Sequence, residues 1–317
     1  MKIGNVFIEK SVGLAPMASV ADTTYRLMAK KFGTAYMTGE MVSAKGLCYN
    51  SAKSKELLTV TDAERPMAVQ LFGNEPDVMA KAAKLAAEYR PDVIDINMGC
   101  PVPKVAGNGS GSALMKTPQL AADIVYSVAD AVNIPVTVKI RKGWDENNVN
   151  AVEFAKLMEK SGCKAITVHG RFKNQMYSGK SDNKIITAVK SEVNVPVIGN
   201  GDITNAETAL KMYEETKCDF IVLGRASYGN PWIFREIKSF LDNGSVLSKP
   251  CFNEIIEVML EHAGLACSIE GEKIVMREFR KHAAWYLKGF HNAAKLRNKC
   301  FQIETYEDLK EIVKSII

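Results

Sequence analysis

The sequence predicts an α/β fold, a (β/α)8 TIM barrel followed by a small C-terminal helical domain. Short β-branched apolar runs alternate with longer amphipathic stretches over most of the 317 residues. This alternation indicates parallel strands joined by right-handed helical crossovers, which can close into a barrel when eight are present. From about Asn253 onward only helical periodicity remains. One barrel of about 250 residues with an appendage therefore fits the length.

Eight segments carry the strand signal. In order they are Val12–Met17, Ala35–Thr38, Met67–Phe72, Val93–Asn97, Val136–Ile140, Ala165–His169, Val195–Ile198 and Phe220–Leu223. Helical patterns opened by a turn residue or a first-turn proline lie between them, as at Pro76–Tyr89, Pro118–Val132 and Asn150–Ser161. A doubly wound sheet is the competing architecture, but it usually has fewer strands and needs a reversal of strand order that no feature marks.

A linker near Asp242–Pro250 separates the two parts, because Asn243-Gly244-Ser245 and Lys249-Pro250 break regular structure. We therefore expect a barrel domain over residues 1–242 and a helical domain over residues 243–317.

Composition excludes several classes of protein. With 47% hydrophobic and 24% charged residues the chain shows no sign of global disorder. Met1–Lys10 holds no apolar run typical of a secretory signal, and no later stretch approaches the ~20 apolar residues of a membrane span. The 7 cysteines never form Cys-x-x-Cys, and His169 has no partner at metal-ligand spacing. We expect a cytoplasmic monomer with free thiols, no membrane partner and no metal.

Unusual residues follow nearly every predicted strand, at the end where barrel enzymes place their chemistry. They are Ala15-Pro16-Met17-Ala18, Gln70, Asn97-Met98-Gly99-Cys100-Pro101, Lys139 with Arg141, His169-Gly170-Arg171, Gly199-Asn200-Gly201-Asp202 and Gly224-Arg225. A barrel without a functional site would not need this pattern.

The last two loops fit a phosphate site. Glycines let backbone N–H groups approach an anion, and the loops after strands seven and eight of a barrel often hold one. Either Asn200-Gly201-Asp202 or Gly224-Arg225-Ala226 alone can be just a tight turn, but the pair favours a phosphate. The glycine-rich segment 107–111 follows no strand directly and lacks the downstream acidic residue of a dinucleotide loop, which argues against that alternative.

Three further side chains are candidates for chemistry, and each has a plainer alternative. Lys139 lies in an otherwise buried run, where it would stabilise negative charge on a reduced flavin or else snorkel to solvent. His169 is a candidate site residue or a hydrogen-bonded residue of the rim. Cys100 lies between glycine and proline on a rigid loop, which favours a chemical role over that of a buried hydrophobic residue. A thiol with a pKa near ~8.5 stays mostly protonated at neutral pH and can donate a proton.

In order along the barrel, these motifs resemble those of the tRNA-dihydrouridine synthases. The matching segments are Ala15-Pro16-Met17, Asp95-Ile96-Asn97-Met98-Gly99-Cys100-Pro101 with Lys104-Val105, Lys139-Ile140-Arg141, Val168-His169-Gly170-Arg171, Gly199-Asn200-Gly201-Asp202-Ile203 and Gly224-Arg225-Ala226. Arg280-Lys281-His282 followed by Trp285-Tyr286 resembles the C-terminal helical domain of the bacterial B-type members. The cysteine loop is the most specific of these motifs.

The resemblance implies FMN as cofactor, NADPH as reductant and tRNA as substrate. It places FMN at Pro16, Met17, Ala18, Gln70, Lys139, His169, Asn200, Gly201, Asp202, Gly224 and Arg225. It places Asn97 and Arg141 near the uracil base. Reduced flavin would pass hydride to C6 of uracil, and Cys100 would be the catalytic residue that protonates C5. The base must leave its stack, so the target lies in a flexible single-stranded region.

Basic residues gather in the predicted helical domain. Between Lys273 and Lys299 there are eight Lys or Arg residues against one Glu, an excess larger than the net charge of +5 of the whole chain. In a helix from Lys273 to Phe290, Arg277, Arg280, Lys281 and Lys288 would face outward, opposite Met276, Phe279, Ala283, Tyr286 and Phe290. We expect Arg277, Arg280 and Lys281 to contact tRNA phosphates, although a solvated face is the plainer alternative. Removing the tail is then expected to leave a flavin-loaded barrel that no longer binds tRNA.

Two other classes share part of this pattern. A small-molecule FMN barrel of the dihydroorotate dehydrogenase kind would need the flavin loops but no basic helical tail. A non-catalytic RNA-binding protein would need the tail but not Lys139, His169 and Cys100 at converging strand ends.

Overall fold

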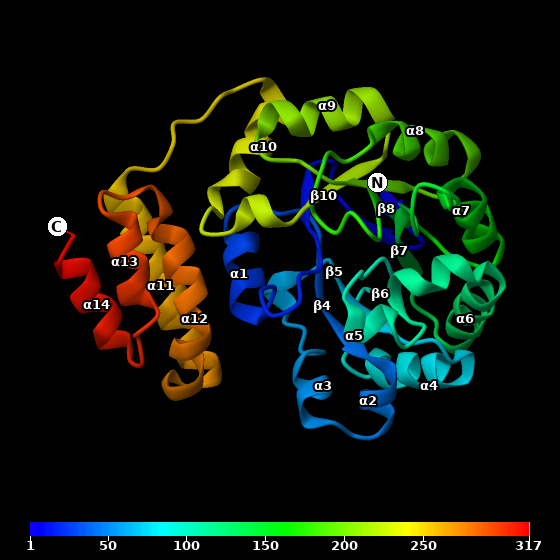
Figure 1. Cartoon of the computed structure of the whole chain (residues 1–317), viewed down its shortest axis with the longest axis horizontal. Coiled ribbons are helices and arrows are strands. Elements are labelled where there is room, and N and C mark those ends of the chain that lie inside the picture. The colour runs from blue at the N-terminus through cyan, green and yellow to red at the C-terminus, as the bar shows by residue number, and fades with distance from the viewer. Residues whose placement is uncertain (317) are drawn as a thin grey trace.

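The centre of the computed structural model, which describes residues 1–316, is a closed barrel of eight parallel strands. The strands are β3 (Val12–Leu14), β4 (Met37–Ser43), β5 (Met67–Phe72), β6 (Val93–Met98), β7 (Val136–Gly143), β8 (Ile166–Phe172), β9 (Val197–Asn200) and β10 (Phe220–Leu223). Each strand pairs with the next one in the chain, and β10 closes the barrel by pairing with β3 (Figure 1). The predicted TIM-barrel fold is confirmed.

All eight predicted strands are present, but several of their ends differ. The predicted strand over Ala35–Thr38 continues to Ser43 in β4, where its register with β5 shifts between Thr38 and Met41. Gly39 and Glu40 interrupt the apolar run there, which is why the sequence pattern ends too early. β3 is shorter than predicted and ends at Leu14, before the loop that contains Pro16.

Helices alternate with the strands and cover the outside of the barrel (Figure 1). They are α1 (Thr23–Lys31), α2 (Ala44–Cys48), α3 (Ala52–Glu56), α4 (Pro76–Ala87), α5 (Pro103–Ala106), α6 (Pro118–Ala131), α7 (Ala151–Lys160), α8 (Asn183–Glu192), α9 (Ala206–Thr216) and α10 (Trp232–Asn243), with short 3-10 turns η1 (Asp62–Glu64), η2 (Gly111–Lys116) and η3 (Arg225–Ser227). The three helices predicted by residue range are confirmed to within two residues at each end. The start of α1 has a local cause, because the side chain of Asp22 accepts a hydrogen bond from Tyr25 N–H and caps the helix.

A short antiparallel hairpin precedes the barrel and was not predicted. It consists of β1 (Lys2–Ile3) and β2 (Val6–Phe7), joined by a turn in which Gly4 has a φ of +57°. Ile3 and Ile8 are fully buried against residues at the amino-terminal ends of the barrel strands. Because the functional loops lie at the other end of the strands, this hairpin closes the barrel without reaching the site.

The last part of the chain is a group of helices beside α1 and α10 (Figure 1). Its helices are α11 (Phe252–Glu270), α12 (Glu272–Tyr286), α13 (Ala293–Cys300) and α14 (Tyr306–Lys314), with the 3-10 turn η4 (Leu287–Gly289). We call residues 251–316 the helical domain. The segment before it has no regular structure between Asn243 and Phe252, where the sequence contains its breakers. No helix within residues 1–316 is both long and apolar enough to cross a membrane.

Candidate active site

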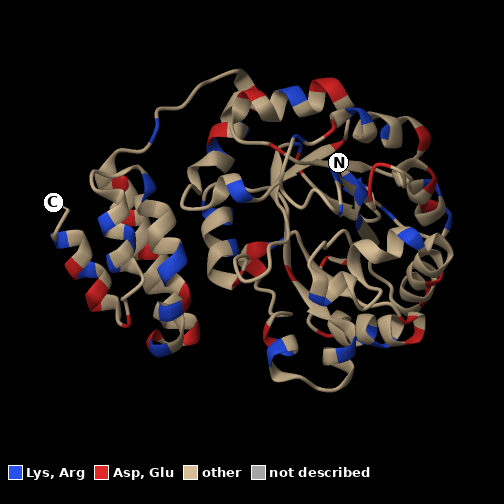
Figure 2. Cartoon of the chain, viewed as in Figure 1, with Lys and Arg blue, Asp and Glu red and all other residues tan. Residues whose placement is uncertain are grey.

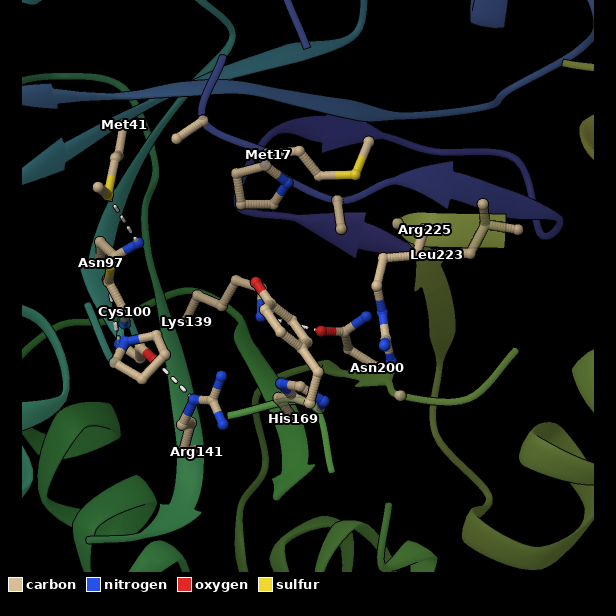
Figure 3. Close-up of a pocket in the computed structure, with 18 of the residues that line it drawn as sticks. Met17, Met41, Asn97, Cys100, Lys139, Arg141, His169, Asn200, Leu223 and Arg225 are labelled. Carbon is tan, nitrogen blue, oxygen red and sulfur yellow. Dashed lines mark hydrogen bonds between the residues drawn. The ribbon is translucent and has the colours of Figure 1, made fainter. Parts of the chain in front are cut away.

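A cavity of about 570 Å³ opens at the carboxyl ends of the barrel strands (Figure 3). Every barrel residue that the sequence marked as catalytic, cofactor-binding or base-contacting lines it. This volume is in the range of cofactor and small-molecule sites. The structure thus brings together residues that are as much as 209 positions apart, from Pro16 to Arg225.

Lys139 lies inside this cavity and does not extend to the solvent. Its Nζ donates a hydrogen bond of 2.9 Å to Asn200 Oδ1, and Asn200 Nδ2 donates to the carbonyl of Val222. Burial and the nearby charge of Arg141 lower the pKa of Lys139 to about 8. The amine is therefore still mostly protonated at neutral pH and offers N–H donors to a ligand.

A hydrogen-bonded chain fixes the amide groups of Gln70 and Asn97. Asp95 accepts from Gln70 Nε2 at 2.6 Å and from Thr137 Oγ1 at 2.6 Å, and Gln70 Oε1 accepts from Asn97 Nδ2 at 2.8 Å. Asn97 Oδ1 in turn accepts from the backbone N–H groups of Gly99 and Cys100. The side chain of Asn97 therefore sets the shape of the loop that carries Cys100.

Cys100 faces the cavity from this loop, close to Arg141 (Figure 3). Burial raises the pKa of the Cys100 thiol, although the charges of Arg141 and Lys139 oppose this effect. The thiol is therefore protonated at neutral pH, which is the form that can donate a proton. The guanidinium of Arg141 is anchored by the carbonyls of Gly99 and Phe172, at 2.7 Å each, and so holds the cysteine loop against the end of β8.

His169 is neutral in this setting. Burial and the positive charges of Lys139 and Arg141 hold its pKa well below the ordinary value. Its Nε2 lies 3.3 Å from Nη1 of Arg171, a group that can only donate, so Nε2 is the acceptor and the ring proton is on Nδ1. His169 is therefore a buried, hydrogen-bonded residue that also lines the cavity.

Arg171 is a buried residue that fixes loops beside the cavity, and the sequence assigned it no role. Its side chain is almost fully buried and its Nη2 donates to both oxygens of Asp202, at 2.7 and 2.9 Å. It also donates to the carbonyls of Ser178 and Gly179, which fixes the loop after β8. Its place in the motif with His169 was the only available signal, because Asp202 is distant in sequence and the two carbonyls lie on an irregular loop.

The loop after β9 has the close backbone packing expected of an anion site. Gly201 has a φ of +130°, and a Cβ atom at this position would lie 2.1 Å from Ser181 Oγ. The carboxylate of Asp202 accepts from Arg171 and from Ser181 N–H, and these bonds hold its pKa below the ordinary value although partial burial opposes them. Asp202 thus orients its neighbours and leaves the backbone of the loop to face the cavity.

The loop after β10 supplies a cation. Arg225 lies 4.6 Å above the ring of Tyr177 and 3.7 Å from Asp202, and its side chain is about half exposed. Tyr177 and Tyr228 also line the cavity, as does Met41. None of these three residues was predicted from the sequence. Met41 follows the end of the predicted second strand, and the two tyrosines lie on loops without a local motif.

The residues predicted to contact tRNA lie on α12, outside the cavity. The predicted inward-facing residues Met276, Phe279, Ala283 and Tyr286 are buried in this helix. Phe290 is buried too, but it lies beyond the helix, which ends at Tyr286 and not at Phe290 as predicted. Arg277 is exposed, with Glu304 at 3.7 Å, whereas Arg280 is only 28% exposed and donates to the carbonyl of Ile303. Figure 2 shows further basic residues along α12 and α13.

A closed barrel with a cavity of mixed polar and apolar lining at the carboxyl ends of its strands is the architecture of TIM-barrel enzymes. The barrel is shared with a solved structure of a morphinone reductase mutant in complex with tetrahydroNAD, at 12% identity and a TM-score of 0.58, covering 80% of this chain and 92% of that chain. An old yellow enzyme homologue from Zymomonas mobilis matches at 15% identity and a TM-score of 0.59, covering 80% of this chain and 94% of the other. At these identities the likeness shows the fold alone.

The family follows from the sequence relatives. The model of the dihydrouridine synthase (Dus) family matches residues 13–317. A probable tRNA-dihydrouridine synthase of Rickettsia conorii is 42% identical over 298 residues, 94% of this chain and 90% of that protein. tRNA-dihydrouridine synthase B of Pasteurella multocida is 40% identical, over 91% of this chain and 87% of the relative. The chain belongs to the dihydrouridine synthase family, which confirms the resemblance and decides against both alternative classes.

Proposed function

We propose that this protein is an FMN-dependent enzyme that reduces the C5–C6 double bond of specific uridines in tRNA to 5,6-dihydrouridine, with NADPH as the reductant. The observation that carries the proposal is the placement of Cys100 in one cavity with Lys139 and the two glycine-containing loops after β9 and β10. We infer the substrate class from the names of the relatives, and the reaction type from the residues of the cavity.

The residues of the cavity fit a flavin nucleotide. The loops that contain Gly201 and Gly224 approach from adjacent strands with Arg225 beside them, so an anionic phosphate would find backbone and guanidinium donors there. The amine of Lys139 and the side chain of Gln70 would hold the polar edge of the ring system. Pro16, Met17 and Ala18 would cover one apolar face, and His169 and Asn200 would complete the binding site.

A flavin bound in this cavity and reduced by NADPH would supply the hydride for C6 of uracil. The protein must supply the second hydrogen. Cys100 donates its proton to C5 and recovers one from solvent, so one hydride and one proton are added and the double bond is lost. Asn97 and Arg141 would orient the base, since both hold the cysteine loop and line the same cavity.

The substrate must reach this cavity as an unstacked base, because a base inside a helical stack cannot lie against a flavin. Arg277, Arg280 and Lys281 would contact tRNA phosphates outside the cavity. Arg277 has the more exposed guanidinium of the two arginines, while Arg280 would first have to share its bond to Ile303. We also propose that the protein acts as a monomer in the cytoplasm.

Two measurements test this proposal. The purified protein should be yellow and should release FMN on denaturation. Incubated with NADPH and unmodified tRNA transcript, it should generate dihydrouridine that nucleoside mass spectrometry detects. A colourless protein that cannot be reconstituted with FMN would refute the cofactor, and a flavin-loaded protein that reduces no tRNA uridine would refute the substrate.

A further inference from the structure

The loop after β10 is held from outside the barrel by the helical domain. The ring of Tyr228, which lines the cavity, stacks on the indole of Trp285 in α12, with ring centroids 4.1 Å apart and planes inclined by 13°. The next residue, Gly229, has a φ of +60°, and a Cβ there would lie 2.4 Å from the backbone carbonyl carbon of Trp285. The backbone of the loop thus packs directly against the carboxyl end of α12.

A hydrogen-bonded chain leads from the same interface to the glycine of the loop. Tyr25 in α1 donates from its hydroxyl to Ser227 Oγ at 2.7 Å, and Ser227 Oγ donates to the carbonyl of Gly224 at 2.7 Å. Ser227 is almost fully buried. On its other side, the ring of Tyr25 packs against His282 and His262 of the helical domain, at 5.5 and 6.0 Å between centroids.

These two links meet on a short segment whose own backbone hydrogen bonds are those of local turns. Residues 224–229 contain one short 3-10 turn between the end of β10 and α10. The side chain of Arg225 points to solvent and the cavity, where it contacts Tyr177 and Asp202 of the barrel. The stack of Tyr228 on Trp285 and the bond from Tyr25 therefore fix the segment from the side of the helical domain and α1.

We propose that Trp285 is a positioning residue for the cofactor: through Tyr228 it holds the Gly224–Arg225 loop in the conformation that binds the phosphate of FMN. The inference rests on the proposed function, because it takes that phosphate as the anion. Docking of the helical domain then becomes part of cofactor binding, and by linkage the bound cofactor strengthens the docking of the domain that carries the tRNA-binding residues.

This coupling changes what truncation should do. A barrel cut after Asp242 loses Trp285 and the ring contacts of Tyr25, so it binds FMN more weakly as well as losing tRNA. The expectation drawn from sequence is that the barrel alone stays loaded with flavin, so the flavin content of the truncated protein distinguishes the two.

The test uses the full chain and compares FMN with riboflavin, which lacks the phosphate. Apoprotein is titrated with each ligand and quenching of flavin fluorescence gives the Kd. Trp285→Ala should weaken FMN binding roughly three- to tenfold, the range expected for loss of one aromatic pair, and leave the riboflavin Kd unchanged. Trp285→Phe keeps a ring at this position and should restore most of the affinity.

Phe290→Ala is the matched control. Phe290 is a buried aromatic residue of the helical domain whose ring partner is Phe252, away from the loop. It should lower the free energy of unfolding but leave the FMN Kd within about twofold. If Trp285→Ala does not fold, Tyr228→Ala removes the same stack from the barrel side. An FMN Kd within twofold of wild type in a folded variant, or an equal loss for riboflavin, would overturn the inference. Failure of the wild-type protein to bind FMN at all would instead refute the proposed function.

Discussion

Replacing Cys100 by alanine separates its chemical role from a structural one. The loop should survive the change, because Asn97 holds it through the backbone N–H groups of Gly99 and Cys100 rather than through the thiol. Only the sulfur is lost from a side chain that is partly open to the cavity, so the cost in folding free energy should be about 1 kcal/mol or less. FMN binding and NADPH oxidation should be almost intact, since neither uses the thiol.

Turnover of uridine should fall by contrast. Loss of a positioned general acid is expected to cost about 10²–10⁴-fold, or roughly 3–5 kcal/mol of transition-state stabilisation. The assay is single-turnover oxidation of prereduced enzyme by tRNA in the absence of oxygen, at equal flavin occupancy. Cys48→Ala is the control, because Cys48 is also a partly buried free thiol but lies outside the cavity. A Cys100→Ala rate within about threefold of wild type would remove Cys100 from the mechanism.

Three further changes test the rest of the site. Lys139→Met should weaken FMN binding roughly ten- to hundredfold, by loss of a charged donor. In the wild type this affinity should decline as the pH rises through about 8, where Lys139 loses its proton, and Lys139→Met should abolish that dependence. Arg171→Met should lower the free energy of unfolding by about 2–4 kcal/mol in urea, because it leaves two carbonyls without their donor and removes the charged partner of Asp202. Gly201→Ala should lower the free energy of unfolding by about 2–4 kcal/mol, because the added Cβ overlaps the side chain of Ser181. It should also abolish most FMN binding.

Each of these has a control in the same chain. Lys211→Met breaks an exposed pair with Glu215 and should change stability by less than about 0.5 kcal/mol. Gly289→Ala meets no atom within 4 Å and should keep FMN affinity. A pH dependence that persists in Lys139→Met would assign the titration to another group. If the Arg171→Met protein is as stable as the Lys211→Met protein, the role given to Arg171 is wrong. If the Gly201→Ala protein binds FMN normally, the role given to Gly201 is wrong.

The barrel could be predicted because its signal is local. Each strand shows an apolar β-branched run, and each active-site loop directly follows one, so reading the strand ends also located the cavity. The prediction stopped where the run was interrupted, as at Gly39 and Glu40, and it missed Met41 for that reason. The hairpin at Lys2–Phe7 was too short to show periodicity.

Residues that act through distant partners could not be found in this way. Arg171 is important because of Asp202 and the carbonyls of Ser178 and Gly179, and no sequence spacing reveals those bonds. Trp285 belongs to a family motif in the sequence, but its contact with Tyr228 depends on how the helical domain docks. Packing between separate parts of a chain leaves no periodic signal in either part.

The electrostatics of the cavity give the thiol and the imidazole different tasks. For His169, burial and the charges of Lys139 and Arg141 act in the same direction, so the ring is neutral throughout the physiological pH range. For Cys100, burial raises the pKa and the two charges lower it, and the effect of burial is the larger. The thiol therefore keeps its proton until the uracil base is bound. After the proton passes to C5, the charges of Lys139 and Arg141 stabilise the thiolate that remains. Removing the charge of Lys139 should consequently slow the step that uses the Cys100 proton, even when FMN is present at saturation.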